Sequence, residues 1–126
     1  MSITNVEKEQ ISLLKEIVLR NSEKLGLDAW EKMALNLNLS DEQLRIIEDI
    51  MNSFEERLDS FKYFELENAL KDELAISYQT VKYIIRALFE DRLYVNVIKN
   101  FLTNMNQLTP GLPIEYKRIF EKISSE

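Results

Sequence analysis

Apolar residues recur along most of this chain at intervals of three and four, the spacing that places side chains on one face of a helix. The first run begins with a capping-box pattern at residues 4–7 (TNVE), and Gly26 is a suitable stop. The sequence therefore predicts a first helix in this region. Its apolar positions are Val6, Ile11, Leu14, Ile17 and Val18.

Later segments repeat the same spacing with their own start signals. Asp28 can cap a short helix that carries Trp30 and Met33, and residues 40–43 (SDEQ) form a second capping box. That box opens a long helix whose stripe comprises Leu44, Ile47, Met51, Phe54 and Leu58. Further helices are predicted over 63–75, 77–90 and 93–106, and Pro113 opens a terminal helix after the loop at 109–113.

No segment alternates between apolar and polar residues, as a β-strand does, over more than a few positions. The chain also has only two glycines and two prolines, the residues that commonly form the turns between strands. We therefore predict an all-α fold, a compact single-domain bundle of six to seven short helices over residues 1–126. The part from 108 to 126 is expected to be a loop followed by a short C-terminal helix.

A break between two helices is predicted near residues 90–92. A continuous helix would carry the apolar stripe of Val81, Ile85 and Leu88 onto the cation Arg92. A break allows Leu93 and Tyr94 to enter the core, and the chain then continues as a helix without a β-wing.

Composition narrows the classes of function. The chain has no cysteine and no histidine, so disulfides, thiolate ligands and the commonest general base are missing. It also lacks glycine-rich phosphate motifs, a signal-peptide pattern and any long apolar run. We therefore expect a non-enzymatic cytoplasmic protein with no cofactor, no metal, no small-molecule substrate and no membrane partner.

Charge is distributed unevenly, and the acidic residues gather on one predicted helix. Residues 1–76 carry a net charge of −8 and residues 77–126 a net charge of +2, which together give −6. A candidate acidic partner face on the 40–58 helix comprises Glu48, Asp49, Glu55, Glu56 and Asp59. Glu48, Asn52 and Glu55 share a helix face and could in principle hold Mg²⁺, but a solvated surface is the simpler explanation.

Residues 70–88 match the spacing of a helix-turn-helix, which predicts such a corner over 64–90. Leu70, Leu74, Val81, Ile85 and Leu88 would face inward, and Ser77 would cap the second helix. The outward positions at the start of that helix form the candidate nucleic-acid or partner contact: Tyr78, Gln79, Lys82, Tyr83 and Arg86. Ala75 stands where glycine commonly opens the turn, and few cations lie nearby, so DNA binding is the less favoured alternative.

Two longer segments carry a resemblance to a known family. LFEDRLYVNVIKNFLTNM (88–105) and LSDEQLRIIEDIMNSFEERL (39–58) resemble a small Bacillus-type family of unknown function represented by YhaI. The resemblance covers about residues 5–106, implies an all-helical fold and supplies neither an activity nor functional residues. Arg92 stands where the resemblance leads us to expect glycine, and residues 110–126 are additional to the pattern.

The sequence thus favours a protein-interaction or regulatory module that contacts another protein or itself, as a homo-oligomer, through its helices. The acidic helix could dock on a basic partner. The alternative is a DNA-binding regulator that uses the 77–88 helix.

Overall fold

The computed structural model describes residues 5–20, 28–109 and 111–125 of the chain. Across these residues it contains seven α-helices and no strand, as the sequence predicts. The helices are α1 (Asn5–Arg20), α3 (Ala29–Asn36), α4 (Asp41–Glu55), α5 (Tyr63–Leu74), α6 (Tyr78–Glu90), α7 (Val95–Leu108) and α8 (Ile114–Ser124).

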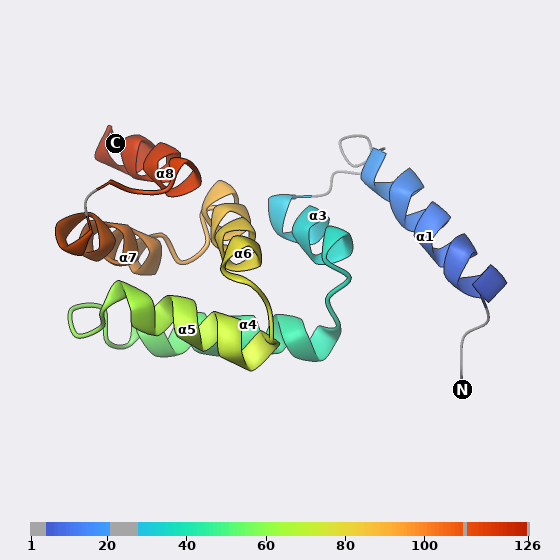
Figure 1. Cartoon of the computed structure of the whole chain (residues 1–126), viewed down its shortest axis with the longest axis horizontal. Helices are drawn as coiled ribbons and strands as arrows, with labels where there is room; N and C mark the ends of the chain where they lie inside the picture. Colours follow the sequence, from blue (N-terminus) through green and yellow to red (C-terminus); the bar gives the residue numbers. More distant parts are fainter. Residues whose placement is uncertain (1–4, 21–27, 110, 126) are drawn as a thin grey trace.

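Helix α6 lies at the centre of the bundle (Figure 1) and packs against α3, α5, α7 and α8. Helices α4 and α5 pack together along one side, and both contact α7. Six of the thirteen residues of α6 are buried, more than in any other described helix. The buried residues form one core around α6, to which α3 contributes Met33 and α8 contributes Tyr116 and Ile119.

The three predicted caps within the described residues, at Asp28, Ser40 and Ser77, are confirmed, whereas the helix predicted from residue 93 begins at Val95. Asp28 accepts a hydrogen bond from the Glu31 amide at 2.7 Å, and Ser77 Oγ accepts from the Thr80 amide at 3.2 Å. Ser40 and Gln43 form the reciprocal capping box, with donor–acceptor distances of 3.1 and 2.9 Å. These caps satisfy amide groups that have no partner inside the helix. Residues 4 and 26, the predicted ends of the first helix, lie outside the described residues.

Three helices end in the same way, on a residue with left-handed backbone conformation. Asn38, Ala75 and Arg92 have φ of 55°, 53° and 60°. In each case the amide of the next residue donates a hydrogen bond to a carbonyl of the preceding helix, at 2.9–3.0 Å. The donor amides are those of Leu39, Ile76 and Leu93, and the acceptor carbonyls are those of Ala34, Lys71 and Leu88, respectively. This is the Schellman arrangement, for which glycine is the usual residue.

The break near residues 90–92 is confirmed, but only one of the two residues after it turns inward. Tyr94 packs against the core, whereas Leu93 remains 39% exposed, so its predicted return to the core was wrong. Arg92 and Tyr94 both hold positive φ angles. These two left-handed residues redirect the chain into α7, which begins at Val95, and Leu93 lies on the outer side of the turn. No β-wing follows within the described part of the chain.

Polar side chains from α6 and α7 hold the ends of distant helices. The Asp91 carboxylate accepts from the amides of Ala29 and Trp30 at 3.0 and 2.7 Å, which caps α3 from the far end of α6. Asn104 accepts from the Tyr63 amide at 2.7 Å at the start of α5. Asn100 donates to the Leu58 carbonyl at 2.9 Å. These bonds tie the N-terminal helices to the core.

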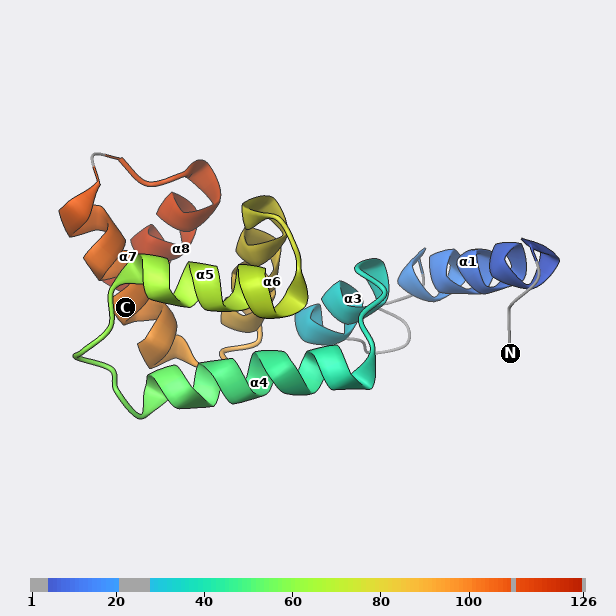
Figure 2. The same ribbon diagram turned by 60° about the horizontal axis from the view of Figure 1, so that its bottom comes forward.

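Helix α1 lies at the edge of the molecule, beyond α3, and projects away from the other helices (Figure 2). Its spacing predicted the helix correctly, but Ile11, Leu14 and Ile17 of the predicted stripe do not reach the core; the side chains of Val6 and Val18 lie outside the described part of the structure. Every side chain described in α1 is exposed except that of Lys15, which is half-buried and donates to the Asn36 carbonyl at 3.4 Å.

Candidate functional site

The predicted corner between α5 and α6 is present. The two helices are joined by residues 75–77, and the predicted inward-facing residues on both sides of the turn are buried: Leu70, Leu74, Val81, Ile85 and Leu88. Ala75 adopts the left-handed conformation that glycine usually supplies at such a turn. The corner is therefore built as its sequence pattern predicted.

The outward face of α6 is accessible only in part, and most of its polar groups already have partners. Tyr78, Gln79 and Arg86 are exposed, and Lys82 and Tyr83 are half-buried. Four contacts engage this face. Tyr78 donates to Asn68 at 2.7 Å, Lys82 to Gln79 at 3.2 Å, and Tyr83 Oη accepts from Asn36 at 3.5 Å. Arg86 pairs with Glu90 at 3.5 Å.

Helices α3 and α8 flank α6, which limits what its outward face can touch. A cavity of about 160 Å³ between α6 and α8 places Arg86 near Arg118 and Lys122, two cations that sequence spacing could not assign to this site. Glu90 and Glu115 line the same cavity, so its charge is mixed. A recognition helix has to present its outward face to the major groove, and here α3 and α8 both pack against α6.

The five residues of the candidate acidic face are all exposed, but they do not form a single site. Their placement on one helix was wrong in part, because α4 ends at Glu55, and Glu56 and Asp59 lie beyond it. Glu48 and Glu55 line a hollow of about 310 Å³ beside Trp30 and Tyr94, whereas Asp49 lines a different groove. Partial burial raises the pKa of Tyr94, and the negative charges of Glu48, Glu55 and Asp49 raise it further. Within the described residues no group of three or more acidic side chains is arranged to hold a metal ion.

The groove that contains Asp49 runs between α4 and α5 and has a volume of about 380 Å³. Its apolar lining comes from Ile46, Ile50, Phe54 and Ala69, and two carboxylates, Asp49 and Glu73, stand at its sides with Ser53. Helical spacing places Ile46 and Ile50 beside the α4 stripe, but it does not reveal a groove. The small side chain of Ala69 on α5 leaves room for the groove. Ala69 lies opposite α4 only in the packed structure, so the sequence alone does not place it there.

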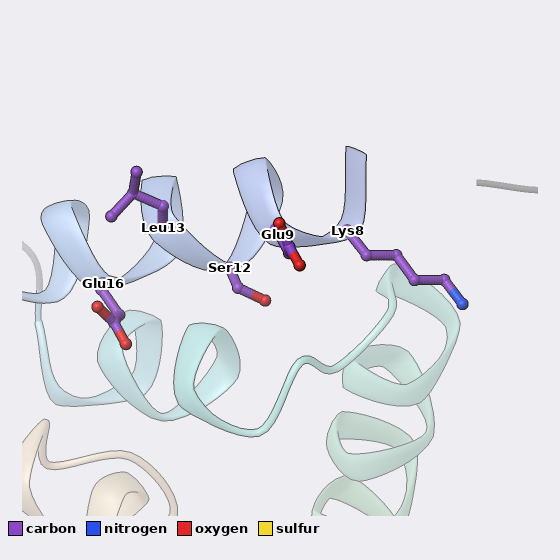
Figure 3. A pocket seen from close by; sticks show the side chains of 5 residues that line it. All are labelled: Lys8, Glu9, Ser12, Leu13 and Glu16. Atoms are coloured by element: carbon purple, nitrogen blue, oxygen red, sulfur yellow. The ribbon is translucent and has the colours of Figure 1, made fainter. Parts of the chain in front are cut away.

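Helix α1 presents a group of exposed apolar side chains that no other described helix matches. Ile11, Leu13, Leu14 and Ile17 are 51%, 56%, 61% and 44% exposed. Figure 3 shows Leu13 pointing away from α3, whereas Ser12 and Glu16 point toward it. The shallow hollow drawn there, lined by Lys8, Glu9, Ser12, Leu13 and Glu16, comes from α1 alone. The apolar face of α1 is therefore turned outward, a direction that the spacing of its residues could not specify.

None of the described helices is long and apolar enough to span a membrane. No family model, curated protein or solved structure matches the chain. The resemblance to the family represented by YhaI therefore stays a prediction.

Proposed function

We propose that the protein is a small, non-enzymatic cytoplasmic module that acts by protein contact, and that the outward apolar face of α1 is its principal contact surface. The cytoplasmic location is supported by composition, because a chain without cysteine uses no disulfide and needs no oxidising compartment. The partner is another protein or a second copy of this chain.

The observation that carries the proposal is the orientation of α1. An amphipathic helix at the surface of a globular protein normally turns its apolar stripe to the core and its polar side to water. Here Lys15 and Ser12 lie on the side of α3, while Leu13 and Leu14 are more than half exposed. Contiguous exposed apolar side chains of this kind are typical of surfaces that bind another protein, often as a helix laid into a groove.

The proposal is tested by making the stripe polar with the pair Ile11→Glu and Leu14→Glu. Exposed positions seldom change stability by more than about 0.5 kcal/mol, so urea denaturation should give nearly the wild-type free energy of unfolding. The tagged protein is then produced in its native cell and the extract is separated by size. The wild type should migrate as a complex, and the substituted protein should migrate as a monomer. A matched control pair on the side of α3, Ser12→Ala and Glu16→Gln, should keep the complex.

Two outcomes would contradict the proposal. A loss of about 2–5 kcal/mol in the substituted protein would show that the stripe packs in its own core. A wild-type protein that migrates as a monomer in the cell extract would show that the face is not in contact with a partner.

DNA binding through Tyr78, Gln79, Lys82, Tyr83 and Arg86 is a less favoured alternative, and no observation of this structure favours it. Helices α3 and α8 flank α6, and Arg86 is paired with Glu90. Most of the negative charge belongs to residues 1–76, which build α1 to α5. A protein with this charge repels phosphate over most of its surface.

A further inference from the structure

We propose that the α4–α5 groove is the seat for α1 of a second copy of this chain, so that two molecules associate by laying the apolar face of one α1 into the groove of the other. This inference rests on the proposed function and names the partner of the same helix. It joins the exposed apolar residues of α1 to a groove whose apolar lining is half-buried, apart from the buried Phe54.

The groove has the shape that receives a helix. Ile46 and Ile50 are half-buried and lie one turn apart along α4, in line with the buried Phe54, and together they form a short apolar ridge. The small Ala69 on α5 leaves a depression beside that ridge, with a volume of about 380 Å³. Helices pack when the ridge of one enters such a depression between the ridges of another.

The exposed apolar residues of α1 recur at the helical spacing that suits a groove between two helices. Helix α1 has 16 residues, so it is about 24 Å long at 1.5 Å per residue. Ile11 and Leu14 lie one turn apart on its outward side and are 51% and 61% exposed. The remaining exposed large apolar residues, such as Phe64, Leu108 and Ile114, lie singly or at helix ends. Among the described elements, only α1 offers a helix-long complement.

Charge favours the same pairing. The two carboxylates at the sides of the groove, Asp49 and Glu73, are exposed, and neither belongs to an ion pair among the described residues. Lys8 lies three residues before Ile11, whereas Lys15, four residues after it, faces α3 and donates to the Asn36 carbonyl at 3.4 Å. Glu9 and Glu16 lie on the opposite side of the helix from Ile11 and Leu14, away from an acidic groove. Of the two lysines, Lys8 is the fully exposed one.

The pairing also gives a closed assembly. If each molecule offers α1 and receives the partner's α1, the two contacts are equivalent and the dimer has twofold symmetry, the commonest arrangement of homo-oligomers. The association then buries the α1 stripe and the groove of both molecules at once.

Engineered disulfides test the proposal directly, because the chain has no cysteine of its own. One preparation carries Leu14→Cys and the other Ala69→Cys, and the two are mixed and oxidised. Docking raises the effective concentration of the two thiols, so the mixed dimer should form about tenfold faster than in controls. The controls are Ser12→Cys with Ala69→Cys, and Leu14→Cys with Gln107→Cys at the exposed end of α7. Circular dichroism confirms that each variant is folded.

Faster formation of the Leu14→Cys and Ala69→Cys mixed dimer supports the proposal. A rate equal to the controls overturns it, and so does a faster homodimer of Leu14→Cys alone, which would mean that two α1 helices pair with each other. Sedimentation equilibrium adds an independent readout. The wild type should show a monomer–dimer equilibrium, and Leu14→Glu should abolish it. A wild type that is monomeric at every concentration overturns the proposal. If α1 contacts a different protein in the cell while these tests are negative, the proposed function stands and this inference falls.

Discussion

At the scale of single residues, Arg92 and Tyr116 occupy positions that a simpler side chain would suit as well or better. Arg92 has φ of 60° and ends the turn after α6, in a backbone region that costs most L-residues free energy. Tyr116 is fully buried, and its hydroxyl has no hydrogen-bond partner among the described residues. Burial, together with the charges of Glu67 and Glu115, raises the pKa of this hydroxyl, so it stays protonated.

Arg92→Gly is expected to leave the free energy of unfolding unchanged or to raise it by about 0.5 kcal/mol. Glycine relieves the strain of the left-handed conformation, and this gain is partly offset by the greater freedom of the unfolded chain. The change also removes the contact of the Arg92 guanidinium with the Phe89 ring at 4.9 Å, which contributes a similar small amount. Urea denaturation checks the result against Lys99→Gly inside α7, which should cost about 1 kcal/mol. An equal loss in both variants would contradict the turn geometry at Arg92.

Tyr116→Phe is expected to stabilise the protein by about 1 kcal/mol, because a buried polar group without a partner carries a desolvation cost of that order. The edge-to-face contact with Phe101, with ring centroids 5.3 Å apart, is retained. Tyr83→Phe is the control, since its hydroxyl has a long contact of 3.5 Å at the surface and little effect is expected. Thermal denaturation measures both. Destabilisation by Tyr116→Phe would show that the hydroxyl is hydrogen-bonded in solution.

At the scale of elements, the ends of α3 and α5 are held by side chains that lie far away in the sequence. Asp91 accepts two amides of α3, and Asn104 accepts the first amide of α5. A carboxylate at a helix N-terminus also interacts favourably with the partial positive charge there. The two Asp91 contacts tie the short α3, with eight residues, to the end of α6, against which it packs.

Asp91→Ala is expected to lower the free energy of unfolding by about 1–2 kcal/mol, since it removes a cap and leaves two amides unsatisfied. Hydrogen exchange should become faster at the amides of Ala29 and Trp30 and remain slow in the buried part of α7. Glu90→Ala is the matched control, because its ion pair with Arg86 lies at the surface and contributes little. Unchanged exchange in α3 after Asp91→Ala would show that the cap is not formed.

Local signals made most of the helices predictable from the sequence. Ser40, Gln43 and Ser77 act within three residues of themselves, so their caps followed from spacing alone. The caps from Asp91 to Ala29 and from Asn104 to Tyr63 bridge separations of 62 and 41 residues and depend on how the helices pack. The outward direction of α1 and the α4–α5 groove were missed for the same reason. Periodicity defines a stripe, but it does not say what covers that stripe.

At the scale of the whole molecule, α6 packs against α3, α5, α7 and α8 while α1 lies at the edge. This arrangement exposes the apolar face of α1 and leaves the helix-turn-helix-like corner flanked by α3 and α8. The first 76 residues, which build α1 to α5, carry a net charge of −8, and negative charge repels the phosphates of nucleic acid.

The wild-type protein is therefore expected not to shift duplex DNA in a gel, even at low salt, where phosphate contacts are strongest. The pair Lys82→Glu and Arg86→Glu should behave like the wild type in this assay and change stability by less than about 0.5 kcal/mol. A salt-sensitive shift by the wild type that the double variant loses would contradict this expectation and support the DNA-binding alternative.

The outward face of α1 as a contact surface is tested most directly by photo-crosslinking from position 14 in living cells. A benzophenone amino acid in place of Leu14, which is 61% exposed, should be tolerated and should yield a light-dependent adduct whose second protein is identified by mass spectrometry. The same group at Ser12, on the side of α3, or at the exposed Asn106 should yield much less. An adduct specific to position 14, with a second copy or with another protein, is the predicted result. Equal yields at the three positions, or no adduct at position 14, would contradict the account.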